Sequence, residues 1–272
     1  MEAALLAWFQ ARGRDLPWRH TRDPYAILVS EVMLQQTQVP RVVARYLEWL
    51  ERWPTIEALA DAPLSEVIRA WQGLGYNRRA VSLHRAARRV AAEGWPDDLT
   101  ELPGVGRYTA DAVARFAFGR AVLPVDTNVR RVRERSQMTF GPQCATALMD
   151  LGATVCLARV PRCDACPLAP ACPSRGRRYE PLRRQSPFAG SFRERRARTL
   201  ARVAGKPAPL ESLDAAAAAL ERDGLLEVSA GVARLPLEEP GTAVTTGCRN
   251  PSEVSIRMSQ SRARTLDYRE GQ

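Results

Sequence analysis

Lysine is almost absent from this 272-residue chain, in which Lys206 is the only one, although lysine and arginine together number 40. Any mechanism that forms a Schiff base with a lysine must therefore use Lys206 or the N-terminal amine. No apolar run reaches the ~20 residues that cross a membrane. The start of the chain, Met1 to Phe9, is short, begins with an acidic residue and lacks a cleavage-site pattern. We therefore expect a cytoplasmic protein.

Strand-like alternation of apolar and polar residues is missing before about residue 180. Apolar spacing and breaks at proline and glycine predict helices instead, together with a cysteine loop that is too interrupted for regular structure. We expect helices over 2–12, 24–34, 40–53, 55–61, 64–72, 77–93, 97–101, 108–118, 128–135 and 145–155. The fold class is therefore all-α over residues 1–180, which we take as the main domain.

The composition changes after Tyr179 toward Arg, Ser, Gly and Pro, which indicates a linker over about 180–195. Helices over 196–202 and 208–224 and a hairpin over 225–235 that turns at Gly231 are expected to follow. Helices followed by a hairpin suggest a small winged-helix-like module within residues 181–236. Residues 237–272 are polar and without pattern, so we expect them to be disordered.

The net charge is +10 and the pI is about 9.9. A basic surface attracts phosphates and releases counterions when it binds them, so nucleic acid is the first partner indicated. An arginine-rich genomic composition would produce the same charge without such a partner. Charge alone leaves both alternatives open.

Two glycines, Gly104 and Gly106, lie between the predicted helices 97–101 and 108–118. Glycine allows a tight turn and close approach of an anion, and the free N–H groups of the next helix attract phosphate. Most glycine pairs between helices are helix caps or packing glycines, so this motif is weak evidence alone.

Two acidic residues occupy positions in the sequence that suggest a catalytic role. Glu31 falls beside apolar neighbours on the predicted helix 24–34, and Asp126 precedes the predicted helix 128–135. The alternatives are structural: Glu31 as a buried acid paired with Arg14 or Arg19, and Asp126 as a helix N-cap. Asp126 is able to fill both roles.

Four of the six cysteines lie close together in the pattern C-x6-C-x2-C-x5-C. Four thiolates in one short loop can enclose a tetrahedral zinc ion or a cubane iron–sulfur cluster. The alternative is disulfide pairing, which a reducing cytoplasm disfavours. The four are Cys156, Cys163, Cys166 and Cys172; Cys144 and Cys248 lie outside the loop.

Most of residues 5–180 resembles the MutY branch of the helix-hairpin-helix DNA glycosylases, the endonuclease III superfamily. The motifs that carry the resemblance are Leu16-Pro-Trp-Arg19, Pro24-Tyr25, Ser30-Glu-Val-Met-Leu-Gln-Gln-Thr-Gln38, Trp71-Gln-Gly-Leu-Gly-Tyr76, Leu102-Pro-Gly-Val-Gly106, Val125-Asp126 with Asn128-Val129, and Met149-Asp-Leu-Gly-Ala153. The resemblance implies two helical lobes with DNA bound across the cleft between them. It also implies a 4Fe-4S cluster, in preference to zinc, in the cysteine loop.

The resemblance implies roles for residues of this sequence. Glu31 matches the acid that protonates adenine and handles the water, and Asp126 matches the acid that stabilises the sugar cation, with Asn128 in the same motif. Protonation near neutral pH requires a raised pKa at Glu31. Tyr108 stands where lyase-competent relatives carry their Schiff-base lysine, so we expect a monofunctional glycosylase. The alternative for Tyr108 is packing on Phe116.

Further matches concern DNA and the extruded base. Gln36 and Tyr76 match positions that approach the opposite strand and wedge the base stack, whereas packing under a neighbouring helix is the alternative for Tyr76. The residues that match the adenine pocket of the family are Arg14, Leu16, Trp18 and Arg19. For Trp18 the alternative is a core aromatic.

Two departures from the family pattern stand out. The segment between Asn128 and Met149 lacks an extra helix, which removes packing behind Asp126. Residues 181–272 are too short and too poor in strands for the Nudix-like domain that reads 8-oxoguanine in the family. Recognition of that base would then fall to Gln36 and Tyr76.

The sequence therefore predicts a monomeric, nucleoid-associated enzyme that removes adenine opposite 8-oxoguanine or guanine in double-stranded DNA, with no membrane partner. A thymine or uracil mismatch glycosylase on the same scaffold is the enzymatic alternative. A non-catalytic DNA-binding paralogue is the alternative of another class, because of the shortened segment after Asn128.

Overall fold

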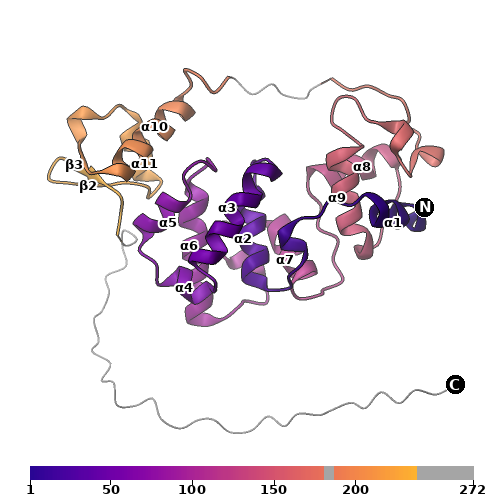
Figure 1. Cartoon of the computed structure of the whole chain (residues 1–272), viewed down its shortest axis with the longest axis horizontal. Coiled ribbons are helices and arrows are strands. Elements are labelled where there is room, and N and C mark those ends of the chain that lie inside the picture. The colour runs from indigo at the N-terminus through magenta and orange to yellow at the C-terminus, as the bar shows by residue number, and fades with distance from the viewer. Residues whose placement is uncertain (181–186, 238–272) are drawn as a thin grey trace, which may run out of the picture. The chain divides into compact units, whose positions relative to one another are not determined.

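A computed structural model describes residues 1–180 and 187–237 (Figure 1). Beyond Leu237, the predicted disordered tail lies outside the described residues. The helices of the first 180 residues are α1 (Glu2–Arg12), α2 (Pro24–Leu34), α3 (Val39–Arg52), α4 (Ile56–Ala60), α5 (Leu64–Ala70), α6 (Arg78–Glu93), α7 (Arg107–Phe116), α8 (Thr127–Ser136) and α9 (Ala145–Thr154). These confirm the predicted all-α class for this part.

One predicted helix, over 97–101, is wrong. The structure has only the 3-10 turn η2 (Leu99–Glu101) there. Pro96 and Pro103 leave too few residues between them for a stable helix. The cysteine loop also contains 3-10 turns, η4 (Cys163–Ala165) and η5 (Ala169–Ala171), rather than longer helices.

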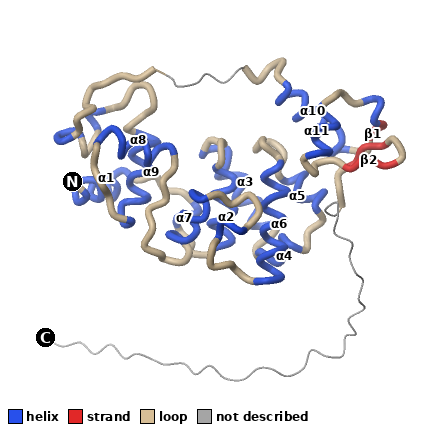
Figure 2. The backbone as a smooth tube through the Cα atoms, turned by 180° about the vertical axis from the view of Figure 1, so that it is seen from behind, coloured by secondary structure: helices blue, strands red, loops and turns tan. Residues whose placement is uncertain are grey.

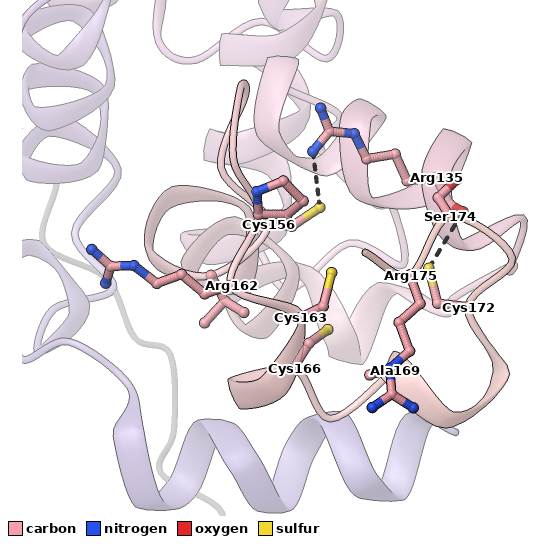
Figure 3. A pocket seen from close by; sticks show the side chains of 11 residues that line it. Arg135, Cys156, Arg162, Cys163, Cys166, Ala169, Cys172, Ser174 and Arg175 are labelled. Carbon is pink, nitrogen blue, oxygen red and sulfur yellow. Dashed lines mark hydrogen bonds between the residues drawn. The ribbon is translucent and has the colours of Figure 1, made fainter. Parts of the chain in front are cut away.

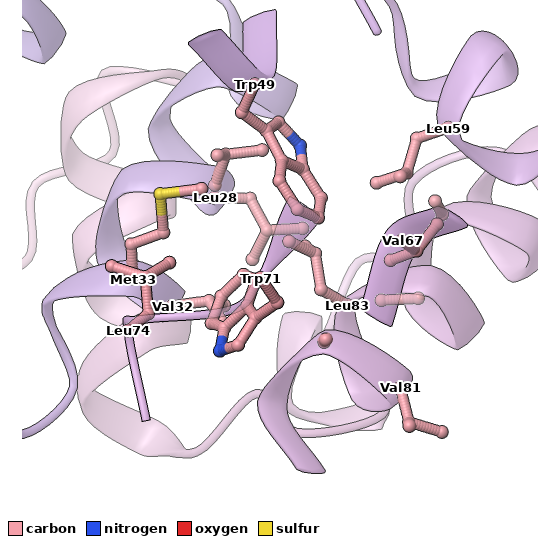
Figure 4. Close-up of a cluster of buried hydrophobic side chains, with 14 of the residues drawn as sticks. Leu28, Val32, Met33, Trp49, Leu59, Val67, Trp71, Leu74, Val81 and Leu83 are labelled. Atoms are coloured by element: carbon pink, nitrogen blue, oxygen red, sulfur yellow. The ribbon is translucent and has the colours of Figure 1, made fainter. Parts of the chain in front are cut away.

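The first lobe is built around α2, whose residues are buried from Tyr25 to Met33 without interruption. A helix that is apolar on all sides needs neighbours on all sides, and α3, α6 and α7 contact it. Figure 4 shows part of the resulting core, where Trp71 lies beside side chains from α2. The carboxylate of Asp23 caps the helix by accepting from the N–H groups of Tyr25 (3.0 Å) and Ala26 (3.3 Å).

The second lobe has its own core despite the short connection after α8. Leu5 of α1, Val129 and Val132 of α8, and Leu148 and Leu151 of α9 are buried together in it. The carboxylate of Glu2 accepts hydrogen bonds from the Gly141 N–H (2.6 Å) and the Gln143 Nε2 (2.7 Å). The connection between α8 and α9 is thereby attached to α1, and α9 packs against both α8 and α1.

The C-terminal module consists of α10 (Phe192–Gly205), β1 (Ala208–Pro209), α11 (Ala216–Arg222), β2 (Glu227–Ser229) and β3 (Val232–Arg234). The antiparallel sheet has the order β1-β3-β2, and its strands are drawn in red in Figure 2. The hairpin at Gly231 is confirmed. The predicted helix 208–224 is correct only over α11, because its first residues form β1 and a 3-10 turn. The helix predicted from 196 begins earlier, at Phe192, within the expected linker.

The module continues the core of the first lobe. Leu200, Val203 and Leu220 belong to the same buried cluster as α2 and α6. Main-chain and side-chain hydrogen bonds join the two parts, from Leu64 N to Leu237 O (3.1 Å) and from Arg69 Nε to Ala204 O (3.1 Å). In the part of the chain that the structure describes, no helix has the length and apolar character of a membrane span.

Candidate active site

A pocket of about 840 Å³ is lined by residues of both lobes. It brings together most of the residues predicted as the site: Arg14, Leu16, Trp18, Arg19, Glu31, Gln36, Tyr108, Asp126 and Asn128. The other three predicted DNA-binding residues, Tyr76, Gly104 and Gly106, are not part of its lining.

Glu31 is 6% exposed, and its Oε2 atom has no hydrogen-bond partner among the described residues. Burial raises the pKa of Glu31 to about 7, and the negative charge of Asp126 acts in the same direction. A hydrogen bond from Tyr108 opposes these effects. Neither Arg14 nor Arg19 pairs with it. A carboxyl group with such a pKa holds a proton near neutral pH and is able to donate it.

Tyr108 lies in the first turn of α7 and lines the pocket close to the carboxyl group of Glu31. Burial, together with the charges of Glu31 and Asp126, raises the pKa of Tyr108 above its ordinary value. The phenol therefore stays protonated and acts as a hydrogen-bond donor.

Asp126 is the N-cap of α8 and also lines the pocket. Its Oδ1 accepts from the Val129 N–H (2.6 Å) and its Oδ2 from Asn128 Nδ2 (2.7 Å). The two hydrogen bonds hold the carboxyl group in a fixed orientation at the positive end of the helix dipole. The predicted capping role and a place in the pocket therefore belong to the same residue.

Asn128 is held in turn by Arg131, which donates to its Oδ1 (2.7 Å). Arg131 also donates to the main-chain oxygens of Gly152 (2.7 Å) and Cys156 (2.7 Å). A chain of hydrogen bonds thus joins Asp126 to the first cysteine of the loop. The sequence did not indicate Arg131, because two of its partners, Gly152 and Cys156, lie more than 20 residues further along the chain.

Arg14 and Arg19 both bind Asp150 on α9, a residue that the sequence analysis did not single out. The Asp150 carboxylate is fully buried and accepts from Arg14 N (2.8 Å), Arg14 Nη2 (2.6 Å) and Arg19 Nη2 (2.6 Å). Burial opposes ionisation, but the hydrogen bonds from Arg19 and Arg14 outweigh it and keep the pKa of Asp150 low. This cluster fixes the loop after α1 against the second lobe.

Trp18 is 9% exposed, as expected of a core aromatic, and it also lines the pocket. Its ring packs edge-on against Tyr46, with a centroid separation of 5.5 Å. Leu16, also buried, adds a second apolar wall. The pocket therefore combines apolar surfaces with the polar groups of Arg14 and Arg19.

Gln36 and Tyr76 have positive φ angles of 56° and 46°. Non-glycine residues rarely adopt this conformation, and it concentrates at functional sites. Tyr76 is 45% exposed, so packing under a neighbouring helix does not describe it.

The glycine hairpin contributes an open helix start. Gly104 has φ +77°, and a Cβ there would meet Ser82 Cβ at 2.6 Å, so close packing on α6 requires glycine. Gly106 is the N-cap of α7 and makes no side-chain cap hydrogen bond. The first N–H groups of α7 are therefore suited to an anion.

The four loop cysteines are free thiols and line one small hollow of about 30 Å³. Figure 3 shows their side chains around this space. Hydrogen bonds reach the sulfur atoms from Arg135 Nη1 to Cys156 Sγ (3.6 Å) and from the Gly176 N–H to Cys163 Sγ (3.3 Å). N–H donors of this kind stabilise thiolates that bind metal.

No three His, Cys, Asp or Glu side chains approach closely enough to hold a single metal ion within the described ranges, 1–180 and 187–237. A multi-metal cluster separates its ligands more widely than one ion does. Four thiols around one hollow, with N–H groups directed at sulfur, fit a cluster as the bound group. Arg159, Arg162 and Arg175 lie exposed on the same loop.

Residues 29–143 match the HhH-GPD superfamily of base excision DNA repair proteins. The adenine DNA glycosylase of Mycobacterium tuberculosis (strain H37Rv) is 44% identical over 249 residues, which cover 78% of this chain and 82% of the relative. The adenine DNA glycosylase of Homo sapiens is 40% identical over 213 residues, covering 64% of this chain and 39% of that protein.

Solved structures agree with the fold. A thermostable thymine-DNA glycosylase has 30% sequence identity and a TM-score of 0.59, over 64% of this chain and 94% of its own. A non-covalent complex of endonuclease III with DNA has a TM-score of 0.55 at 23% identity, over 63% of this chain and 93% of its own, and shows the fold alone.

Proposed function

The chain belongs to the adenine DNA glycosylases of the HhH-GPD base excision repair superfamily, and we propose that it removes adenine paired with 8-oxoguanine or guanine in duplex DNA. The observation that carries this proposal is the pocket itself, where a buried Glu31 with a raised pKa meets a capped Asp126. Acid-assisted cleavage of an N-glycosidic bond needs this pair of carboxyl groups in two different protonation states.

The reaction begins when adenine leaves the base stack and enters the pocket between the lobes. Leu16 and Trp18 supply apolar walls for the base, and the guanidinium groups of Arg14 and Arg19, fixed by Asp150, border it. Adenine is a poor leaving group as an anion. The protonated Glu31 therefore donates its proton to a ring nitrogen while the glycosidic bond breaks.

Asp126 faces the sugar that remains. Its carboxylate, held by two hydrogen bonds, stabilises the positive charge that develops on the sugar ring. Glu31, now ionised, then accepts a proton from the attacking water. The products are free adenine and an abasic site in an intact strand.

Strand cleavage by β-elimination needs an amine that this site lacks. Tyr108 occupies the position of the lysine in lyase-competent relatives, and Lys206 does not line the pocket. We therefore propose a monofunctional enzyme.

The cysteine loop holds a 4Fe-4S cluster in this proposal, with Cys156, Cys163, Cys166 and Cys172 as ligands. The cluster supplies a structural centre for the loop rather than a chemical step. The exposed arginines of the loop then contact the DNA backbone, as do the first N–H groups of α7 at Gly104 and Gly106. Arg131 connects the loop to Asn128 and Asp126.

Gln36 and Tyr76 approach the strand opposite the adenine. We assign to these two residues the discrimination between 8-oxoguanine and guanine. In this proposal the protein acts as a monomer on double-stranded DNA, in the compartment that contains the DNA. Residues 1–180 form the glycosylase domain, and residues 187–236 form the accessory module.

A second candidate substrate is thymine mispaired with guanine, which the similarity to a thymine-DNA glycosylase structure favours. The buried Glu31 argues for adenine, whose ring nitrogens accept a proton. A duplex with one T·G mismatch distinguishes the two, because release of thymine together with inactivity on A·8-oxoG would support the second candidate.

The test uses an end-labelled duplex with one central A·8-oxoG or A·G pair. We expect strand scission only after alkali with wild-type protein and none with Glu31→Gln. Scission without alkali would contradict the monofunctional mechanism. A protein that binds this duplex but yields no alkali-labile site at any concentration is a DNA-binding paralogue.

A further inference from the structure

Arg79, in the first turn of α6, is a buried guanidinium without a carboxylate partner among the described residues. It is 9% exposed, and its hydrogen bonds go to main-chain oxygens and one hydroxyl group. The acceptors are Val32 O (2.8 Å), Met33 O (3.0 Å), Gln35 O (2.6 Å), Thr37 Oγ1 (3.0 Å), Leu74 O (3.2 Å), Gly75 O (2.8 Å) and Tyr76 O (3.4 Å).

These acceptors belong to two separate segments. One is the C-terminal end of α2 and the turn after it, which contains Gln36. The other is the loop that ends at Tyr76. A guanidinium satisfies the free carbonyl groups at the end of α2 and complements the negative end of its dipole. Arg79 therefore joins the helix that carries Glu31 to the loop of Tyr76.

Two aromatic rings also lie near the guanidinium group. Its central carbon lies 5.2 Å from the Trp71 ring centroid and 5.7 Å from that of Tyr76. The Trp71 Nε1 donates to Gly75 O (3.2 Å), so the tryptophan holds the same loop. Figure 4 shows Trp71 near Val32 and Met33, beside the end of α2.

Gln36 and Tyr76 are the non-glycine residues with positive φ in the two segments that Arg79 binds. A bulky residue keeps such a conformation only where its surroundings determine it. On either side of these residues, Arg79 binds Gln35 O and Thr37 Oγ1 in one segment and Gly75 O and Tyr76 O in the other. The same side chain therefore determines both unfavourable conformations.

Burying a cation without a counter-ion is costly, and burial lowers the pKa of Arg79 to about 10. A helix end can be capped at lower cost by glycine. The arrangement therefore indicates that a fixed distance between the two segments has functional value.

We propose that Arg79 is a positioning residue for base extrusion, which holds Gln36 and Tyr76 at a fixed separation so that both enter the duplex together. The inference rests on the proposed function, because it assigns these two residues to the DNA. The inference adds Arg79, which in this proposal contacts neither the DNA nor the extruded base. It also explains why the segments of Gln36 and Tyr76 both border this one buried arginine.

The test compares Arg79→Gln and Arg79→Lys with a matched control, Leu83→Ala. Leu83 is buried on the same helix and reaches neither segment through a hydrogen bond. The duplex carries adenine opposite 8-oxoguanine, with 2-aminopurine beside the 8-oxoguanine to report unstacking. Binding is measured by anisotropy, unstacking by fluorescence in the Glu31→Gln background, and excision under single-turnover conditions below the melting temperature of each variant.

We expect Arg79→Gln to lose most of the fluorescence rise and about 10²-fold in single-turnover rate, because misplaced groups lose catalysis steeply. Duplex affinity should change by less than about threefold, since phosphate contacts dominate it. The fluorescence rise and the single-turnover rate of Arg79→Lys should lie between those of wild type and those of Arg79→Gln, because an ammonium group cannot reach all these acceptors. Leu83→Ala should keep the fluorescence rise although it lowers the melting temperature.

A full fluorescence rise in Arg79→Gln would overturn the inference. An equal loss in Leu83→Ala would overturn it as well, because the loss would then follow from stability alone. If wild-type protein unstacks the reporter and excises no adenine, while Arg79→Gln fails to unstack it, the proposed function is wrong and the positioning role of Arg79 stands.

Discussion

The two acidic residues of the pocket, Glu31 on one wall and Asp126 on the other, place their carboxyl groups in opposite surroundings. Glu31 comes from the middle of an apolar helix that is buried on all sides, and one of its oxygens has no partner among the described residues. Asp126 comes from the start of a polar helix, where both of its oxygens accept hydrogen bonds. The comparison teaches that the position of a carboxyl group within a helix decides how many hydrogen bonds it receives, and the proposed roles of proton donor and anion follow this difference.

The substitution with the largest expected effect on this difference is at Glu31. Glu31→Gln should lower the single-turnover rate at least about 10³-fold, because an amide cannot donate a proton to adenine. Excision of adenine from an A·8-oxoG duplex measures this. Residual activity above about a tenth of wild type would contradict the role of Glu31.

The same substitution should raise stability at neutral pH. The folded protein keeps a proton on Glu31 up to about pH 7, whereas the unfolded chain releases it near 4.5. Stability therefore falls as pH rises between these values, by about 2–3 kcal/mol. Thermal melting of Glu31→Gln against wild type should show the gain at pH 8 and little gain at pH 5.

The substitution Asp126→Asn removes the negative charge at the other wall of the pocket and keeps a side chain that can cap α8. Asparagine is also a good N-cap, so the melting temperature should change little. The rate should fall about 10²-fold or more, because the charge beside the developing sugar cation is lost. Asp126→Ala should lose the rate and, in addition, about 1 kcal/mol of stability. If Asp126→Asn remained fully active, Asp126 would be only a cap.

Gly152→Ala tests how firmly Asp126 is supported from behind. A Cβ at Gly152 would meet Asn128 Cβ at 2.7 Å and Asn128 O at 2.9 Å. Because backbone must move, we expect a loss of about 1–3 kcal/mol and roughly a tenfold slower excision. Gly205→Ala is the matched control, since a Cβ there meets nothing within 4 Å. Equal behaviour of the two variants would contradict the close contact between α8 and α9.

The helices of the first 180 residues were largely predictable, because helical spacing and capping residues are local in sequence, whereas most of the pocket residues were predicted from the family resemblance. Glu31 could be singled out by its apolar neighbours. Asp150 and Arg79 could not, since their partners lie on other elements. The helix over 208–224 was predicted too long, because the alanine-rich run suggests one continuous helix, whereas Pro207 and Pro209 favour extended backbone before α11.

The smallest effect is expected at Tyr108. Its hydrogen bond lowers the pKa of Glu31, so Tyr108→Phe should raise that pKa further. The alkaline limb of the pH–rate profile should move upward, with only a few-fold change in the maximal rate. A shift toward lower pH would show that the phenol does not donate to the carboxyl group.

The most direct test of the two-wall account is the single-turnover rate of adenine excision between pH 5 and 9. The account predicts that the rate declines about tenfold per pH unit above about pH 7, as Glu31 loses its proton. A rate that stays level up to pH 9 would contradict the assignment of Glu31 as the acid.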